Sequence, residues 1–163
     1  HDIGIAMTVK EKHQYWFAAP PQANDMPVFF FETPHGDFYG IPPIAGTGIK
    51  VAQHTGGREH DGPIDLATAK DEKDLEQVRR FAAAHFDFEL GSLRSHQACM
   101  YTMSPDEHFI VDQHPLHSNV VFAGGLSGHG FKFTPVLGAI LAQLACSEEP
   151  ELAIDFLRLG RFG

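Results

Sequence analysis

The first half of this sequence consists of short runs of β-branched and aromatic residues, each followed by a cluster of turn-forming residues. Such runs are long enough for strands and too short for helices. They predict strands over residues 3–9, 14–18, 28–32, 38–41 and 49–54. The turn cluster Pro34–Asp37 joins the third run to the fourth and predicts a β-hairpin. Strands therefore dominate the first half of the predicted fold.

Helix signals appear later in the chain. Residues 69–85 have an apolar stripe at helical spacing, with acidic residues in the first turns and arginines further on, which suits the helix dipole. Thr134 and Pro135 are typical of an N-cap and a first helical residue, and this second helix is expected to end near residue 145. Further predicted segments are strands over 95–102, 109–112 and 119–123, a loop over 56–63, and a tail over 156–162 that packs on a neighbour. The irregular order of strands and helices indicates an α+β fold rather than a βαβ series.

Composition and charge argue against several functions. With 163 residues, 43% of them hydrophobic, the chain can fold around a core. A formal net charge of -9 and the lack of Lys/Arg clusters argue against nucleic acid as a partner. Two cysteines do not make a disulfide framework, so we expect a reducing, cytoplasmic location. No secretory signal is present, and the most apolar stretch, 136–146, is far shorter than the ~20 residues that span a membrane.

One stretch combines a thiol, a glycine-rich turn, a helix start and a lysine. Cys99 precedes a strand-like run, and Ser127–Lys132 (Ser-Gly-His-Gly-Phe-Lys) comes just before the second predicted helix. Glycines permit close backbone approach, and a helix N-terminus presents free N–H groups and partial positive charge. The combination suggests a covalently held cofactor with the helix end and Lys132 directed at its electron-rich edge. The plainer alternatives are a buried core cysteine, an ordinary turn and a surface lysine. The other cysteine, Cys146, ends an apolar helix and is assigned to packing.

Lys50 lies inside an apolar predicted strand. Strand alternation creates two faces, with Lys50, Ala52 and His54 on one and Ile49, Val51 and Gln53 on the other. A lysine in this position either faces solvent or points into a site. His54 alone could equally be a satisfied polar group at a strand edge.

These segments resemble the flavin-linked amine oxidases that include monomeric sarcosine oxidase and N-methyltryptophan oxidase. The resemblance runs from about Met26 to the C-terminus. It rests on the residues that follow Cys99, on Ser127–Lys132, and on Phe38–Pro42 followed by Gly48–Lys50 and His54.

The resemblance implies a role for each candidate residue. Cys99 would tether FAD through a thioether to the flavin ring methyl, Lys50 would promote reduction of O2, and Lys132 would bind the substrate carboxylate. Tyr39 and His54 would shape the substrate pocket. The implied cofactor-binding loop consists of Ser127, Gly128, His129, Gly130, Phe131 and Lys132. The implied substrate is a small N-methyl or secondary amino acid, which O2 oxidises to an imine with release of hydrogen peroxide.

The start of the chain departs from this family. It begins with His1 rather than Met, and neither the Gly-x-Gly-x-x-Gly fingerprint for the FAD pyrophosphate nor the upstream arginine for the substrate carboxylate is present. We therefore expect the C-terminal part of such an enzyme, inactive alone, whose partner is the missing N-terminal FAD-binding half with its Rossmann portion. Residues 1–90 would form a mostly antiparallel substrate-binding sheet with one helix, and residues 91–163 the last strand and helix of the FAD-binding domain. The alternative is a folded fragment without cofactor that acts as a structural or interaction module.

Two further clusters invite a chemical interpretation that we do not adopt. Among the eleven histidines, the one close pair is His114 and His117, and no Cys/His spacing fits structural zinc, so no metal site is expected. Asp106, Glu107 and His108 are adjacent, and adjacent strand residues alternate sides and cannot all converge. These three residues are assigned a structural role.

Overall fold

The computed structural model describes residues 3–60, 65 and 67–163. The chain forms two compact units, which we call unit 1 (residues 1–10 and 101–163) and unit 2 (residues 11–100). The boundaries between the units fall inside two long strands, β1 (Thr8–Phe17) and β6 (Leu93–Met103). Both units combine helices with antiparallel strand pairs, which agrees with the predicted mixture of helices and antiparallel sheet. The predicted division at residue 90 lies before β6, whereas the second unit boundary lies within that strand.

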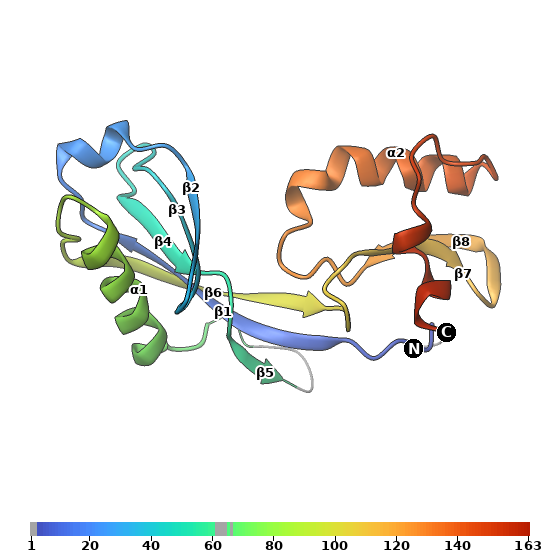
Figure 1. Cartoon of the computed structure of the whole chain (residues 1–163), viewed down its shortest axis with the longest axis horizontal. Helices are drawn as coiled ribbons and strands as arrows, with labels where there is room; N and C mark the ends of the chain where they lie inside the picture. Colours follow the sequence, from blue (N-terminus) through green and yellow to red (C-terminus); the bar gives the residue numbers. More distant parts are fainter. Residues whose placement is uncertain (1–2, 61–64, 66) are drawn as a thin grey trace. The chain divides into compact units, whose positions relative to one another are not determined.

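Unit 2 is a sheet with a helix against one face (Figure 1). The strand order is β2-β3-β4-β1-β5, and β6 also pairs with β1. Besides β1 and β6, its elements are η1 (Pro21–Asp25), β2 (Phe29–Thr33), β3 (Gly36–Ile41), β4 (Ile49–Gln53), β5 (Arg58–His60) and α1 (Glu72–His85). The predicted hairpin is confirmed, because β2 and β3 pair antiparallel with Thr33 opposite Gly36.

Alternate residues of the central strands form the core of unit 2 with helix α1. The core consists of Tyr15, Phe17, Phe38, Ile49 and Val51 from the sheet and Leu75, Val78 and Phe81 from the helix. Phe38 stacks on Phe81 with 4.4 Å between ring centroids. Full burial of each such side chain contributes roughly 1.5–3 kcal/mol. The predicted apolar stripe of the helix is thus confirmed, although the helix begins only at Glu72, where the Asp71 carboxylate accepts hydrogen bonds from two free backbone amides.

Unit 1 is built around a hairpin covered by a helix (Figure 1). Its elements are β7 (Ile110–His114), β8 (His117–Gly124), η2 (Phe131–Phe133), α2 (Thr134–Ala145), η3 (Asp155–Leu157) and η4 (Leu159–Phe162). Its core joins the hairpin, α2 and the C-terminal segment through Phe109, Val111, Leu137, Ile140, Ile154 and Leu157. The predicted tail therefore forms two short 3-10 helices, and the first of them, η3, contributes Leu157 to this core.

Four predictions about local structure are wrong. One continuous strand, β1, replaces the two predicted over 3–9 and 14–18, because its polar centre is buried and paired rather than a break. Strand β5 lies inside the predicted loop 56–63, of which residues 61–63 are outside the described residues. Thr134 is not the N-cap: its hydroxyl donates to the carbonyl of Phe131 at 2.7 Å, and η2 already turns the chain before it. Cys146 is exposed rather than packed.

Candidate active site

The sheet face opposite α1 carries three of the predicted catalytic residues. Residues directly opposite each other in an antiparallel pair share a face, and Trp16 lies opposite Lys50 while Tyr39 lies opposite Ala52. The core residues Ile49 and Val51 point to α1, so the alternate residues point away from it. Tyr39, Lys50 and His54 are therefore brought together on one face; the alternation predicted this for Lys50 and His54, and the strand pairing adds Tyr39.

Aromatic rings surround the two polar members of this group. The ammonium of Lys50 lies 5.4 Å from the ring centre of Trp16 and 5.2 Å from that of Tyr39. The ring of His54 lies 5.4 Å from Phe30 and 6.4 Å from Tyr39, edge to face in both cases. Such a face offers flat apolar surface together with one cation, which suits a planar ligand that gains negative charge.

Lys50 is half-buried, and this changes its acidity. Burial lowers the pKa of the Lys50 ammonium, while the negative charge that Cys99 can carry acts in the opposite direction. Within the described part of the chain its ammonium is held by aromatic faces rather than by a carboxylate. A partly desolvated cation without a carboxylate partner is typical of functional sites.

Cys99 lies on β6 and is half-buried. Its neighbour Ala98 is 1% exposed, and strand alternation turns the two side chains to opposite sides of the sheet. The buried core cysteine considered from the sequence is therefore not what the structure shows. The thiol of Cys99 is close enough to influence the pKa of Lys50. Because it is partly exposed, it also has the access that a nucleophilic cysteine requires.

The glycine-rich loop belongs to unit 1 and is held by hydrogen bonds within that unit. Ser127 is 2% exposed, and its hydroxyl donates to the carbonyl of Gly125 at 3.0 Å while accepting from the backbone amide of Ser104 at 3.3 Å. Gly128 has φ +80°, and a Cβ atom there would collide with the ring of Tyr101. Ser127 thus shapes the loop from inside, and Gly128 is required by the close approach of an aromatic ring.

The other loop residues differ in exposure. The ring of His129 packs on Phe109 with 4.6 Å between centroids. Phe131 is 92% exposed, and the exposed Lys132 has its ammonium 5.5 Å from the ring centre of Phe133. Helix α2 begins directly after these residues, at Thr134. Phe131 and Lys132 are therefore accessible to a ligand beside a helix N-terminus, whereas the hydroxyl of Ser127 is not.

A groove of about 350 Å³ adjoins this loop within unit 1. Lys132 and His129 line it, together with apolar side chains of α2 and of the segment 152–157. The predicted site residues therefore form two groups, one in each unit: Tyr39, Lys50, His54 and Cys99 in unit 2, and Ser127 to Lys132 in unit 1.

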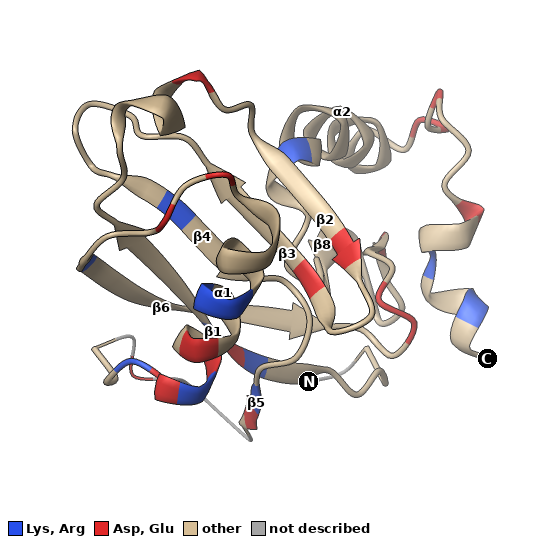
Figure 2. Cartoon of the chain, turned by 60° about the vertical axis from the view of Figure 1, so that its left-hand side comes forward, with Lys and Arg blue, Asp and Glu red and all other residues tan. Residues whose placement is uncertain are grey.

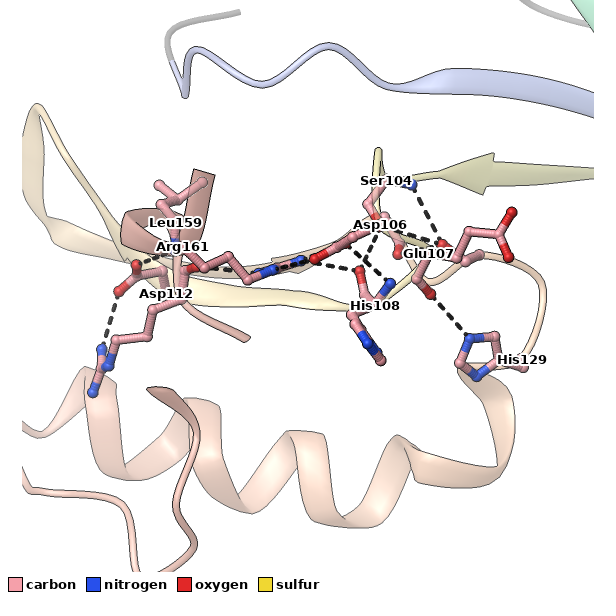
Figure 3. A network of polar contacts seen from close by, with 11 residues as sticks. Ser104, Asp106, Glu107, His108, Asp112, His129, Leu159 and Arg161 are labelled. Atoms are coloured by element: carbon pink, nitrogen blue, oxygen red, sulfur yellow. Dashed lines mark hydrogen bonds and ion pairs between the residues drawn. The ribbon is translucent and has the colours of Figure 1, made fainter. Parts of the chain in front are cut away.

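The segment Asp106–His108 lies in a turn and not in a strand, contrary to the sequence interpretation. Figure 3 shows that its polar groups serve internal contacts. Both carboxylate oxygens of Asp106 accept from Arg161, at 2.7 and 3.0 Å, and this guanidinium holds the pKa of the Asp106 carboxyl well below its usual range. The described residues contain no group of three or more His, Cys, Asp or Glu side chains that could hold a metal ion.

Sequence reasoning missed Trp16, Phe30 and Arg161. Trp16 and Phe30 belong to the Lys50 face only because of the pairing register between strands, which the sequence does not display. Arg161 meets a partner 55 positions earlier. The aromatic content of the runs 14–18 and 28–32 is the one signal that could have drawn attention to the first two.

Comparisons with known proteins show which family the chain belongs to. A family model described as FAD dependent oxidoreductase matches residues 2–144, and the chain belongs to this family. The chain is 41% identical over 138 residues to monomeric sarcosine oxidase of Bacillus sp. (strain B-0618), and 36% identical over 156 residues to N-methyl-L-tryptophan oxidase of Salmonella typhi. These matches cover 84% and 90% of this chain, but only 35% and 40% of the relatives. The chain thus spans well under half the length of the relatives it matches.

Solved structures show the same fold at low identity. A thermally stable mutant of fructosyl peptide oxidase matches with a TM-score of 0.79 and 19% identity, over 97% of this chain and 42% of its own. L-Proline dehydrogenase from P. horikoshii matches with a TM-score of 0.77 and 20% identity, over 97% and 41%. Among the described residues, no helix is both long and apolar enough to cross a membrane.

Proposed function

We propose that this chain is the C-terminal part of an FAD-dependent oxidase that acts on N-methyl or other secondary amino acids and forms an imine and hydrogen peroxide. The observation that carries the proposal is the half-buried cation of Lys50 on the same sheet face as Tyr39 and His54, with the partly exposed thiol of Cys99 close enough to influence its charge. The sarcosine and N-methyl-L-tryptophan oxidases at 36–41% identity supply the substrate class.

The residues present fit a flavin. An accessible thiol stands beside flat aromatic surface in unit 2, and an exposed lysine stands beside a helix N-terminus in unit 1. Cys99 would hold the cofactor covalently, and the exposed residues of the glycine-rich loop would contact it. When bound, FAD supplies the acceptor for a hydride equivalent from the amine and passes the electrons on to O2.

Lys50 and Lys132 have different tasks in this proposal. A fixed, partly desolvated cation at Lys50 stabilises the negative charge that develops on oxygen as it is reduced, and it needs no reorganisation at that moment. The exposed Lys132 has the reach to bind the substrate carboxylate through a charge-assisted hydrogen bond. Tyr39 and His54, with Trp16 and Phe30, shape the surface on which the amine lies.

The proposed partner of this chain is the remaining, FAD-binding part of the enzyme. Helix α2 carries no charged residue from Thr134 to Ala145, and it is tan in Figure 2 after the blue segment that precedes it, although positions Gly138, Ala139 and Ala142 are exposed. A helix that is apolar all round is normally covered on every side. The short coverage of the relatives, at 35–40% of their length, supports the same proposal.

Covalent flavin tests the proposal in the parent protein. The absorption bands of oxidised flavin should remain with the acid-precipitated wild type and should be lost from precipitated Cys99→Ser, because the thiol is the nucleophile for the ring methyl. Cys146→Ser is the matched control, since Cys146 is also a free thiol but lies at the exposed end of α2, and it should retain the flavin. A colourless wild-type protein would instead favour a structural or interaction module. The 163-residue chain alone should release no peroxide with sarcosine or N-methyltryptophan.

A further inference from the structure

We propose that Arg161 is a positioning residue for the glycine-rich loop: from the C-terminal helix η4 it fixes the turn 104–108, and this turn fixes Ser127 and His129. The proposal goes beyond the tail's contribution to the core of unit 1. It rests on the proposed function only in treating the loop as the segment that contacts the flavin.

Arg161 holds the turn at two points. Its Nε and Nη2 atoms donate to the two carboxylate oxygens of Asp106 at 2.7 and 3.0 Å, and Nη2 also donates to the carbonyl of His108 at 3.2 Å (Figure 3). The side chain of Arg161 is only 13% exposed, and its guanidinium lies 4.1 Å from the ring centre of Phe162. The carboxylate of Asp106 itself remains 35% exposed, but a forked contact of this kind fixes direction as well as distance.

The turn 104–108 contacts the glycine-rich loop at two points, Ser127 and His129. The hydroxyl of Ser104 lies 3.2 Å from a carboxylate oxygen of Asp106 and 2.6 Å from the carbonyl of His108, and the amide of the same serine donates to the Ser127 hydroxyl at 3.3 Å. The Nε2 atom of His129 lies 3.3 Å from the carbonyl of Glu107 (Figure 3). Ser127 is thus linked to Asp106 through Ser104, and His129 contacts the carbonyl of Glu107, which lies in the chain between the two residues that Arg161 holds.

Backbone strain explains why such a restraint is needed. Glu107 and Ser127 are not glycine, yet their φ angles are +62° and +48°. Residues in this left-handed region persist where the surrounding contacts over-determine the conformation. Glu107 lies within the turn held by Arg161, and Ser127 within the loop held by the turn. Loss of the guanidinium removes a restraint on Glu107 directly and weakens the support of Ser127, whose amide also donates to the carbonyl of Thr102 at 2.9 Å, so the loop should open more often.

Arg158 provides a matched control on the same tail. Its Nη1 donates to Asp112 of β7 at 3.0 Å, and the amide of Leu159 donates to the same carboxylate at 2.9 Å (Figure 3). This pair docks the tail on the hairpin, whereas the Arg161 pair docks it on the turn 104–108, and neither Arg158 nor Asp112 contacts that turn in the described contacts. Loss of Arg158 therefore tests the effect of a loosened tail without the link to the loop.

Hydrogen exchange followed by mass spectrometry tests the proposal without any cofactor. In Arg161→Gln, exchange in peptides that cover 126–130 should accelerate by about tenfold or more relative to the β7 peptide of the same unit. In Arg158→Gln the two peptides should change together. Arg161→Lys keeps the charge but not the fork, so the loop should still exchange faster than in the wild type. Equal acceleration of loop and β7 in Arg161→Gln and Arg161→Lys, or the same loop effect in Arg158→Gln, would overturn the role of Arg161.

In the flavin-loaded parent protein, Arg161→Gln should also shift the visible flavin spectrum, whereas Arg158→Gln should leave it unchanged. An unchanged spectrum in Arg161→Gln would overturn the proposed link between this residue and the cofactor. The two ideas fail separately: a parent protein without flavin contradicts the proposed function, while the exchange rates of the loop alone decide whether Arg161 positions it.

Discussion

The buried Glu11 and the half-buried Lys50 of unit 2 have opposite surroundings. Glu11 is 2% exposed, and its carboxylate meets Arg58 at 2.6 Å, His60 at 2.7 Å and His13 at 3.2 Å. Lys50 is half-buried beside aromatic rings instead. A buried charge that is fully paired has a structural role. A partly buried charge without a carboxylate partner can instead interact with a ligand or a reacting group. This contrast makes Lys50 the better functional candidate.

Lys50→Met in the parent protein should slow the reaction of the reduced enzyme with O2 by about 100-fold to 1,000-fold, as expected for loss of one preorganised electrostatic contact. Reduction by the amine should change by less than about threefold, because it places no comparable charge near Lys50. Stopped-flow kinetics follow the two half-reactions separately. Lys132→Met is the comparison, and should mainly raise the dissociation constant of the substrate in the reductive half-reaction.

The oxygen reaction should also depend on pH. Burial lowers the pKa of Lys50 below its ordinary value of 10.5, so the cation is lost at a lower pH than for an exposed lysine. The rate should therefore fall as pH rises toward 10.5, and Lys50→Met should abolish that fall. An oxygen rate within about threefold of wild type in the variant would identify Lys50 as an ordinary strand lysine.

Glu11→Gln should destabilise the protein by about 1.5–3 kcal/mol at neutral pH, the range for hydrogen bonds to charged groups. Burial would raise the pKa of Glu11, but its hydrogen bonds to Arg58 and His60 outweigh burial and the pKa is lowered. The stabilisation is thus present above the ordinary value of 4.5 and is lost as pH falls through the lowered folded value. Denaturant unfolding at several pH values should show the two proteins converging in acid.

Glu76→Gln is the control for this change. Glu76 forms an exposed ion pair with Arg80 on α1, and such pairs contribute at most about 1 kcal/mol. Equal losses from the two variants would mean that the Glu11 cluster does not stabilise β1 in the way its geometry indicates.

The shared face of Lys50 and His54 could be predicted from period-two alternation, and the family resemblance added Tyr39 as a pocket residue. Trp16 could not, because its position opposite Lys50 depends on a pairing between strands that are distant in the sequence. The role of Arg161 could not be predicted for the same reason, because its partner Asp106 lies 55 positions earlier in the sequence.

At the scale of elements, patterns within a segment were reliable and their ends were not. The stripe of α1 and the β2–β3 hairpin followed from spacing alone. The polar centre of β1 predicts a break because the sequence does not show the groups that satisfy it. They come from β5, from the carbonyl of Thr55 and from β6, where the Nε2 of His96 lies 2.7 Å from Nδ1 of His13. A polar run predicts a break only when its side chains have no partners elsewhere in the fold.

Glycine is required at position 128 but not at position 138. Gly128→Ala should destabilise the protein by more than about 1 kcal/mol, because φ +80° disfavours an L-residue and the new Cβ meets the ring of Tyr101. Gly138→Ala in α2 meets no atom within 4 Å and should stabilise the 163-residue chain by about 0.5–1 kcal/mol. Thermal unfolding of both variants measures the difference. Similar shifts in melting temperature would contradict the close contact between the loop and Tyr101.

At the scale of the whole molecule, the two long helices differ in the surface they present. Exposed positions of α1 are mixed with charged residues, whereas α2 has none, as Figure 2 shows. Large apolar side chains are also exposed beside α2 in unit 1, namely Phe131, Phe133, Leu152 and Phe156. Contiguous apolar surface of this kind marks a contact with another polypeptide. For α2 we assign it to the proposed FAD-binding part of the enzyme.

A charge placed on each helix tests this assignment. In the 163-residue chain, Ala142→Arg on α2 and Ala83→Arg on α1 should both be tolerated, because both positions are exposed. In the parent protein, Ala142→Arg should lower the melting temperature and the flavin content, since burying an unpaired guanidinium against a partner costs several kcal/mol. Ala83→Arg, on a helix that already carries charges, should change neither. If the parent protein tolerates Ala142→Arg as well as Ala83→Arg, then α2 faces solvent there, and its apolar surface has another cause.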